Sequence, residues 1–424
     1  MHASMLSGAC TEPSIRHAVV ALAALHEATI TVQQSRSLSF DRLGLVANMH
    51  HRQAIKHYSK AIQIMRKTVA SGAQDMRTTL VTCFMIFGFE AFHGNIALAV
   101  AQVQTGIALI GEWKENYLLR GTPYSAPDED VIETFLCLEI QTMTFHDNRP
   151  YESHAVLRKE YASKVQNMPS SFSSMWEATK YFYLVKKHLE HFLHVSKRFM
   201  SLYRGAGEDS LTTRHGRENL LQEAMSYQAY HQEEFSRWYA SFEALLRQSD
   251  LENDSDAAAR VNYLQLHFKA SNLVLQTALA TDELIYDDYT AKFSEIISLA
   301  TELIEKVESR SKTARWTFDL SVVFPLYLVG IKCRFSMIKH QALGLLRRSQ
   351  RREGIWDNIL VWRIVRWIQS TEDEAMEGEL IPGWARVEDV QSSFDVQERY
   401  VEVKCQQRLA EGSALRERSI NIEW

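Results

Sequence analysis

The sequence predicts an all-α protein in which helical hairpins stack into an array or bundle. Apolar residues recur every three or four positions through long stretches of the chain, and this spacing places them on one face of a helix. Only 7 prolines and 17 glycines interrupt the 424 residues, so few positions are available to break helices. Since no repeat of fixed period occurs, we expect one helical domain over residues 1–424.

The first helices follow from their capping signals. Thr11 is placed to cap a helix, and Pro13 follows at a position where its missing N–H costs little. A second helix is predicted over residues 46–70, and it should end at the helix-breaking pair Ser71-Gly72.

The next segments continue the same alternation of helix and turn. Residues 78–92 are apolar on nearly every side, so we expect this helix to be enclosed on several sides. A turn at residues 93–95 should lead into an apolar helix over residues 96–110. Further helices are expected at residues 128–147, 173–204, 216–248, 257–282, 290–310, 321–347 and 355–375. Residues 399–409 alternate in the manner of a short C-terminal strand.

The charge balance argues against a nucleic-acid-binding protein. Lys plus Arg number 47 against 52 Asp plus Glu, and the formal net charge is -5. The chain therefore lacks the positive field that supplies most non-specific affinity for nucleic acid. We expect no direct contact with nucleic acid.

The cysteines predict neither a metal cluster nor a disulfide framework. Their number is odd, they are separated by tens of residues, and none forms a C-x-x-C pair. They are Cys10, Cys83, Cys137, Cys333 and Cys405. We expect reduced thiols and an intracellular protein, in the nucleus or the cytoplasm. No signal peptide is evident, and no window reaches about 18 uncharged apolar residues, so we expect no contact with a membrane.

Three histidines at successive spacings of three residues raise the question of a metal site. His188, His191 and His194 lie on one predicted helix. Because three residues advance about 300° around a helix, the set drifts by about 120° in total, and one ion would meet at most two of them. No H-E-x-x-H motif accompanies them. We therefore expect a solvated helix edge and no metal ligand.

The motifs of the common enzyme classes are absent. The sequence contains no G-x-S-x-G, no P-loop and no G-x-G-x-x-G after a strand, and we expect no cofactor. Three polar residues instead lie within apolar helices: His146, His267 and Tyr327. A buried histidine or tyrosine needs a partner, which can be another core residue or a ligand in a cavity.

Four arginines fall within six positions. Arg347 and Arg348 close a predicted amphipathic helix, where cations favour the helix dipole and can bond the last free carbonyls. Arg351, Arg352 and Glu353 are expected to fill a tight turn between two helices. Because no aromatic ladder or basic helix accompanies them, we predict that the guanidinium groups pair with carboxylates and fix a corner, and do not bind phosphate.

Several blocks of residues together point to a known family. They are Glu12–Glu27, His57–Lys67, Phe84–Gly94, Gly106–Ile110, Phe135–Asp147, Phe318-Asp319, Pro325–Tyr327, Lys332–Arg334, Ala342-Leu343, Leu345-Leu346 and Arg352–Asp357. In these blocks the chain resembles the regulatory, or middle homology, region of fungal zinc-cluster transcription factors. The resemblance spans nearly the whole sequence.

The resemblance implies an all-helical domain that senses metabolites, joins subunits and restrains or exposes an activation surface. In that family, DNA is contacted by a separate six-cysteine zinc cluster that lies upstream. Here the resemblance begins almost at Met1, and the five cysteines cannot supply such a cluster. We therefore expect no DNA-binding module in this chain.

Two functions fit these observations. The first is a regulatory protein that binds a small apolar metabolite or a protein partner, such as a second copy of the chain, and influences transcription of a secondary-metabolism pathway without touching DNA. The second is a cofactor-independent cyclase of the Diels-Alder or pericyclase type, which folds a polyketide or terpenoid in the same helical interior. Such catalysis needs shape and a hydrogen-bond donor more than a nucleophile.

The burial pattern of the sequence suggests residues for this site. The candidate donors to a substrate carbonyl are His146, His267 and Tyr327. The candidate aromatic walls around a ligand are Phe145, Tyr263 and Trp316.

Overall fold

The computed structural model divides the chain into two compact units. The residues that it describes are 12–35, 41–71, 75–120, 128–145, 147, 149–205, 214–248, 255–310, 316–318, 321–349, 352–376, 378, 381–395 and 400–423. The first unit comprises Met1–Thr142 and Phe394–Arg399, and the second comprises Met143–Ser393 and Tyr400–Trp424. The single domain expected over residues 1–424 stays a prediction.

The first unit is built from helices. They are α2 (Pro13–Ser35), α3 (Asp41–Ala70), α4 (Met76–His93), α5 (Ile96–Arg120) and most of α6 (Glu129–Phe145). Within this unit α2 packs against α3 and α4, and α4 packs against α5.

The second unit combines helices with short strands. Its α-helices are α7 (Tyr151–Gln166), α8 (Met175–Gly205), α9 (Arg214–Gln248), α10 (Ser255–Thr277), α11 (Thr290–Arg310), α12 (Val323–Lys332), α13 (Ser336–Arg348) and α14 (Asn358–Asp373). Its 3-10 helices are η2 (Glu283–Tyr289) and η3 (Gly383–Ala385). Its strands are β1 (Trp316–Thr317), β2 (Arg352–Glu353), β3 (Trp356–Asp357), β4 (Glu388–Asp395, whose last two residues belong to the first unit), β5 (Tyr400–Arg408) and β6 (Leu415–Glu423).

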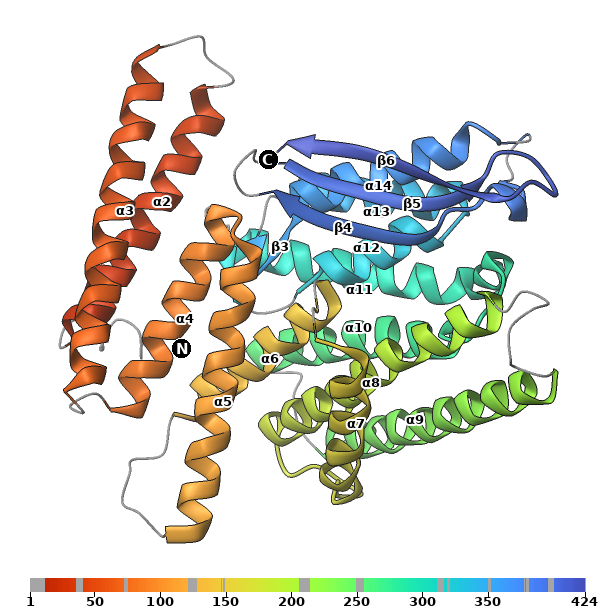
Figure 1. Ribbon diagram of the computed structural model, residues 1–424, viewed down its shortest axis with the longest axis horizontal. Helices are drawn as coiled ribbons and strands as arrows, with labels where there is room; N and C mark the ends of the chain where they lie inside the picture. The colour runs from red at the N-terminus through yellow and green to blue at the C-terminus, as the bar shows by residue number, and fades with distance from the viewer. Residues whose placement is uncertain are drawn as a thin grey trace. The chain divides into compact units, whose positions relative to one another are not determined.

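Helices that follow one another in sequence pack side by side, as the predicted hairpins require. In the second unit the adjacent pairs are α7 with α8, α8 with α9, α10 with α11, and α12 with α13. Figure 1 shows α8 and α9, and likewise α10 and α11, as neighbouring helices of the second unit. The predicted all-α class is confirmed, because helices contain most of the described residues and the strands are few and short.

The enclosed helix predicted over residues 78–92 is confirmed as α4. Nearly every residue in its middle is buried. Asp75 caps its start by accepting a hydrogen bond from the backbone N–H of Thr78 at 2.6 Å. At its end Gly94 adopts a φ of 88°, and the N–H of Asn95 donates to the carbonyl of Glu90 at 2.9 Å. The turn expected at residues 93–95 therefore has the left-handed glycine cap that its sequence predicts.

The C-terminal β-element is larger than the single strand that the sequence suggests. Strands β4, β5 and β6 form a sheet in that order, and β5 pairs with β6 in antiparallel register from Tyr400↔Glu423 onward. Only β5 alternates fully between buried and half-exposed positions, with Val403 and Cys405 among its buried residues. Gln407 ties this strand to α14 by donating to the carbonyl of Thr371 at 3.1 Å. The outer strands are too polar to show such alternation in sequence.

The corner around the arginines is a small sheet and not the bare turn that was expected. Strand β2 pairs in parallel with β1 and antiparallel with β3. Gly354 makes the turn between β2 and β3 with a φ of 56°, and its N–H donates to the carbonyl of Thr317 at 2.8 Å. Helix α14 consequently begins at Asn358, so the expected start at residue 355 is wrong, and Trp356 belongs to β3.

Two of the arginines fix this corner through carboxylates, as predicted. Arg352 donates twice to Asp357, at 3.1 and 2.6 Å, and Arg348 pairs with Glu308 on α11. Arg351 lies outside the described residues.

The last carbonyls of α13 are bonded by an asparagine and not by arginines, which corrects the expectation for Arg347 and Arg348. The Arg347 guanidinium lies 5.8 Å from the ring centre of Trp362. The side-chain amide of Asn358 donates to the carbonyl of Leu346 at 2.7 Å and also to that of Ser349. The first residue of α14 therefore caps the C-terminal end of α13.

Glu353 holds the beginning of α12. Its side chain is fully buried, and its carboxylate accepts hydrogen bonds from the backbone N–H groups of Ser321, Val322 and Val323 at 2.8, 3.0 and 3.1 Å. The first N–H groups of a helix have no partner within the helix and carry partial positive charge. A carboxylate from a distant strand therefore supplies the cap that α12 lacks in its own sequence.

Helices α12 and α14 approach each other closely. A Cβ atom at Gly330 would lie 2.5 Å from Cγ1 of Val365, so only glycine fits at this contact. The side-chain amide of Gln369 donates to the carbonyl of Gly330 at 2.9 Å. The cap holds the N-terminal end of α12, and this close contact fixes the position of its C-terminal end.

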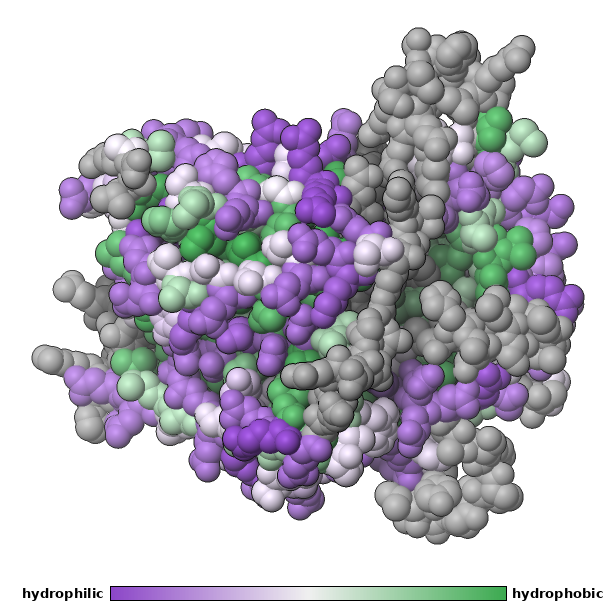
Figure 2. All heavy atoms as spheres, turned by 180° about the vertical axis from the view of Figure 1, so that it is seen from behind, coloured by the Kyte–Doolittle hydropathy of each residue, from purple (hydrophilic) through white to green (hydrophobic). Residues whose placement is uncertain are grey.

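The face drawn in Figure 2 shows no extended membrane-binding patch among its described residues. The face in Figure 2 is mainly hydrophilic, and its hydrophobic residues lie in small separate groups. Residues 96–115 of α5 are long and apolar enough to cross a membrane, but this criterion is also met by core helices of soluble proteins. One such helix is weak evidence for a membrane span.

We predict that Glu353→Ala lowers the free energy of unfolding by about 3 kcal/mol or more, because three buried N–H donors lose their charged acceptor. The matched control is Glu308→Ala, which removes the partly exposed partner of Arg348 and should cost less than about 1 kcal/mol. Urea denaturation followed by circular dichroism measures both. Equal losses in the two variants would contradict the role assigned to Glu353.

Candidate functional site

A cluster of aromatic rings surrounds Trp356 in the second unit. The ring centre of Trp356 lies 4.7 Å from that of Phe145, 5.8 Å from Phe324 and 5.7 Å from Tyr327. Phe324 and Tyr327 are three residues apart on α12, so they share one face of that helix. We call these four residues the Trp356 cluster. Edge-to-face and tilted contacts of this kind are favourable for aromatic pairs.

Two polar groups of this cluster are available as hydrogen-bond donors. The indole N–H of Trp356 is buried and has no acceptor among the described residues. Tyr327 is half-buried, and burial raises its pKa to about 12, so its hydroxyl remains a neutral donor. A buried polar group without a partner costs about 1–3 kcal/mol. A ligand carbonyl is one group that would satisfy either donor.

His267 lies beside this cluster and is fully buried. Its Nε2 lies 2.8 Å from the carbonyl of Ser321, which only a protonated Nε2 can bond as a donor. Nδ1 then carries a lone pair, and it has no partner among the described residues. Burial, together with the charge of Lys186, lowers the pKa of His267 to about 3. The neutral ring therefore offers an acceptor, whereas the sequence analysis proposed it as a donor.

Lys186 brings a buried charge to the same region. Its ammonium group donates to Glu190 at 2.9 Å and to Ser271 at 3.1 Å, and it lies 5.0 Å from the ring centre of Phe324. The side chain is 1% exposed. A buried ammonium group requires such partners because its transfer from water is costly. Lys186 links α8 to α10 and α12 at the edge of the Trp356 cluster.

The structure brings four of the six candidate residues of the sequence analysis into one region. Phe145 and Tyr327 contact Trp356 directly. The ring centre of Tyr263 lies 4.7 Å from that of His267, and its hydroxyl lies 3.1 Å from the hydroxyl of Tyr183. The region is continuous, since His267 bonds the residue whose N–H is held by Glu353.

The other two candidates cannot be placed in the site. His146 lies outside the described residues. Trp316 is in β1, where its backbone pairs with Arg352, but its side chain is not described.

The solvated helix edge expected for the three histidines of α8 is wrong. His188 and His191 are buried, and His194 is half-buried. Their neighbours come from other helices: His191 lies 3.0 Å from His154 between Nδ1 atoms, and the rings of His194 and His154 stack at 4.3 Å. The drift of about 120° around α8 separates His188, which faces His231 and Glu234 of α9, from His191 and His194, which both contact His154 of α7.

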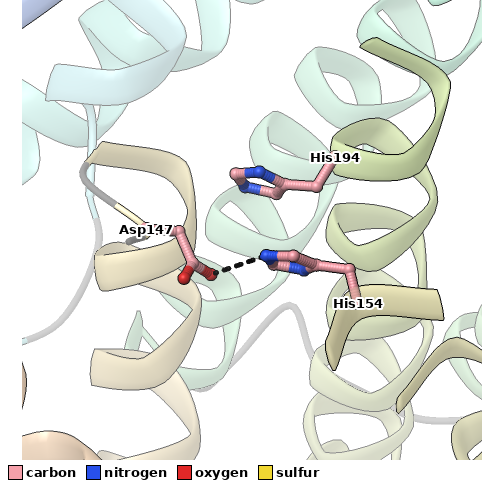
Figure 3. Close-up of side chains that lie close together, drawn as sticks. All are labelled: Asp147, His154 and His194. Atoms are coloured by element: carbon pink, nitrogen blue, oxygen red, sulfur yellow. Dashed lines mark ion pairs between the residues drawn. The ribbon is translucent and has the colours of Figure 1, made fainter. Parts of the chain in front are cut away.

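One group that could hold a metal ion is Asp147 with His154 and His194 (Figure 3). The Asp147 carboxylate lies 3.8 Å from Nε2 of His154. It is already bonded by Arg149 through several contacts, among them 2.9 Å from Nε to Oδ1. Hydrogen bonds and the charge of this guanidinium lower the pKa of Asp147 despite its burial. The guanidinium group of Arg149 thus already supplies the positive charge that a metal ion would bring to Asp147.

A second such group is His188 on α8 with His231 and Glu234 on α9. Nδ1 of His188 lies 2.8 Å from Oε2 of Glu234, and Nδ1 of His231 lies 3.1 Å from the same oxygen. Hydrogen bonds from the imidazoles outweigh desolvation and lower the pKa of Glu234 to about 2. Burial lowers the pKa of His231 to about 4. At neutral pH an ionised carboxylate therefore faces neutral His231.

The sequence alone does not point to the central residues of the Trp356 cluster or of the group formed by His188, His231 and Glu234. Trp356 was assigned to the start of a helix, although its place in the Arg352–Asp357 block was a usable signal. Lys186, His231 and Glu234 carried no local signal, because their partners lie on other helices.

Comparison with known proteins agrees with the family resemblance seen in the sequence. A family model described as "Fungal specific transcription factor domain" matches residues 4–366. The chain is similar to the aspercryptin biosynthesis cluster-specific transcription regulator atnN of Emericella nidulans, with 20% identity over 453 aligned positions. That alignment covers 88% of this chain and 70% of the regulator. No solved structure matches the chain.

We predict that His267 makes stability depend on pH. In the unfolded chain a histidine binds a proton below about pH 6.5, whereas the folded pKa of His267 is about 3. The unfolded state therefore binds more protons as pH falls, and the free energy of unfolding should drop by up to about 1.4 kcal/mol per pH unit between about pH 6 and 4.

Urea denaturation across this pH range compares the wild type with His267→Gln. The free energy of unfolding of the variant should fall less steeply with decreasing pH, by up to the same amount per pH unit. The control is His340→Gln, at an exposed position of α13, which should keep the wild-type slope. An unchanged slope in His267→Gln would show that the ring titrates in the folded state.

Proposed function

Because the chain belongs to the fungal specific transcription factor domain family, we propose that it is a ligand-responsive regulatory domain for a secondary-metabolism pathway. It binds a small, mainly apolar metabolite at the Trp356 cluster and influences transcription. The observation that carries the proposal is the pair of unpartnered polar atoms, the N–H of Trp356 and Nδ1 of His267, beside aromatic rings in T-shaped and tilted contact. Apolar walls with a few convergent polar groups are characteristic of small-molecule sites.

The chemistry of the cluster selects a class of ligand. Aromatic faces from Phe145, Phe324 and Tyr327 favour a planar or polycyclic apolar body. The N–H of Trp356 favours a carbonyl oxygen, and Nδ1 of His267 favours a hydroxyl group. An oxygenated polyketide or terpenoid has these features.

The location of Trp356 gives the ligand a route to the rest of the unit. Trp356 lies in β3, two residues before the first residue of α14, and Asp357 caps that helix by accepting from the N–H groups of Ile359 and Leu360. A ligand that displaces the Trp356 ring therefore acts on the start of α14. A small shift at a packed contact can be transmitted because packed interfaces do not deform continuously.

The relative supports a proposal for the pathway and the compartment. Its printed name makes it a regulator specific to one biosynthetic cluster. We propose the corresponding role for this chain, in the nucleus, through a protein partner or a second copy of the chain. Direct promoter binding is not part of the proposal, because the sequence has 5 cysteines where the zinc cluster of such factors uses six, and its formal net charge is -5.

A cofactor-independent cyclase is the second candidate function. The observation that favours it is the same: an unpartnered N–H and a neutral phenol beside aromatic walls could bind the carbonyl of a folded linear substrate. The regulator is preferred because family membership supports it independently of this site.

The transcriptional test uses a deletion strain complemented with variants. Deletion should lower the transcripts of a neighbouring biosynthetic cluster several-fold, and the wild-type gene should restore them. Trp356→Phe combined with Tyr327→Phe keeps the rings but removes both donors, so it should fail to restore them at equal protein level. The control Trp176→Phe changes an exposed tryptophan of α8 and should restore them fully.

The outcomes separate the two candidate functions. Unchanged cluster transcripts in the deletion strain would refute the regulator. If one product then disappears while its linear precursor accumulates, and the purified chain converts that precursor, the cyclase is supported. A sequence-selective gel shift by the purified chain alone would contradict a role without DNA contact.

A further inference from the structure

We propose that His188, His231 and Glu234 bind one zinc ion between helices α8 and α9. The expectation of no metal ligand considered only residues close together in the sequence, whereas this set joins positions 188 and 234 across two packed helices. The site is independent of the Trp356 cluster and of the function proposed for it.

The separations of the donor atoms fit a tetrahedral zinc site. Zinc bonds imidazole nitrogen at about 2.0–2.1 Å and carboxylate oxygen at about 2.0–2.2 Å, so two ligand atoms of a tetrahedron lie about 3.3 Å apart. Nδ1 of His188 and Nδ1 of His231 lie 2.8 and 3.1 Å from Oε2 of Glu234, and all three ligand atoms lie within 4.8 Å of one another. The two nitrogen–oxygen separations are therefore within a few tenths of an ångström of the tetrahedral value.

The elements that carry these residues make the arrangement rigid. His231 and Glu234 are three residues apart on α9 and therefore point from one face of that helix. His188 comes from α8, and its ring centre lies 4.3 Å from that of His231. The three side chains are 1%, 0% and 3% exposed for His188, His231 and Glu234. The side chains are thus positioned before an ion arrives. Because Nδ1 of each ring donates its proton to a hydrogen bond with Glu234, zinc binding requires this proton to move to Nε2 of the same ring.

The surroundings also supply a cation with what it needs. A buried carboxylate requires a compensating charge, and the described hydrogen bonds of Glu234 come from two imidazoles and the Tyr230 hydroxyl. Imidazole with a carboxylate is a common zinc ligand set, and three protein ligands leave a fourth position for water. Tyr230 is suited to orient the carboxylate from outside the ligand shell.

The neighbouring group in Figure 3 is a poorer site. Asp147 is already neutralised by Arg149, which donates to both of its oxygens. In the group of His188, His231 and Glu234, no lysine or arginine among the described residues bonds the carboxylate. Charge therefore favours the second group over the first.

Binding should be tested on the full chain after removal of metal with a chelator. Cobalt(II), added as a spectroscopic substitute for zinc, should bind with a stoichiometry of one and give the intense visible absorption of a tetrahedral site. Zinc should displace it and raise the thermal unfolding midpoint, because an ion that binds only the folded state stabilises it.

Variants locate the ion. Glu234→Gln and His231→Gln should each weaken binding at least about tenfold, whereas the control Asp147→Asn in the neighbouring group should bind like the wild type. His231→Cys offers a ligand that zinc and cobalt accept, so it should retain binding and add a thiolate-to-cobalt absorption band. The new absorption band is a gained signal, so a loss of stability in a variant cannot produce it.

Three results would overturn the proposal. The first is no binding to the wild type by calorimetry or absorption. The second is binding that survives in both Glu234→Gln and His231→Gln, which would place the ion elsewhere. The third is binding that Asp147→Asn abolishes, which would assign the ion to the neighbouring group.

Discussion

The carboxylate of Glu353 is the contact on which the corner of the second unit depends. It accepts three N–H groups at the beginning of α12, where helical donors have no partner of their own. Because the side chain is fully buried, water cannot replace it, so strand β2 and helix α12 must stay together. This arrangement places Trp356, three residues further on, against Phe324 and Tyr327 of the same helix. The aromatic cluster is thus a consequence of how one helix is capped.

Charged side chains that are buried in the second unit are stabilised by ion pairs. Lys186 pairs with Glu190, and Arg334 pairs with Glu372 at 2.6 Å. Burial lowers the pKa of His267 to about 3, which keeps the ring neutral. The indole N–H of Trp356 and Nδ1 of His267 are among the buried polar atoms of this unit that have no hydrogen-bond partner in the described part of the chain, as are Nε2 of His154 and His231.

Helix α8 connects the ligand site and the metal site that we propose. Lys186 faces α10 and α12 at the edge of the Trp356 cluster, while His188, two residues later, faces α9. An ion that ties α8 to α9 would therefore hold in place the helix that presents Lys186. A ligand at the cluster would act on the other side of the same helix. Such a shared element is the physical requirement for coupling between two sites.

The sequence by itself determined the all-α class, the enclosed helix α4 with its turn at residues 93–95, and the family, because helical periodicity and capping are local properties. It also indicated carboxylate partners for the arginines. Only the tertiary structure placed Trp356 in a strand, since β2, with which β3 pairs, itself pairs with β1 about 35 residues earlier. Likewise only the packing of α8 on α9 brought His188 to Glu234. A partner on another helix leaves no periodic mark in the sequence, so these sites depended on the fold.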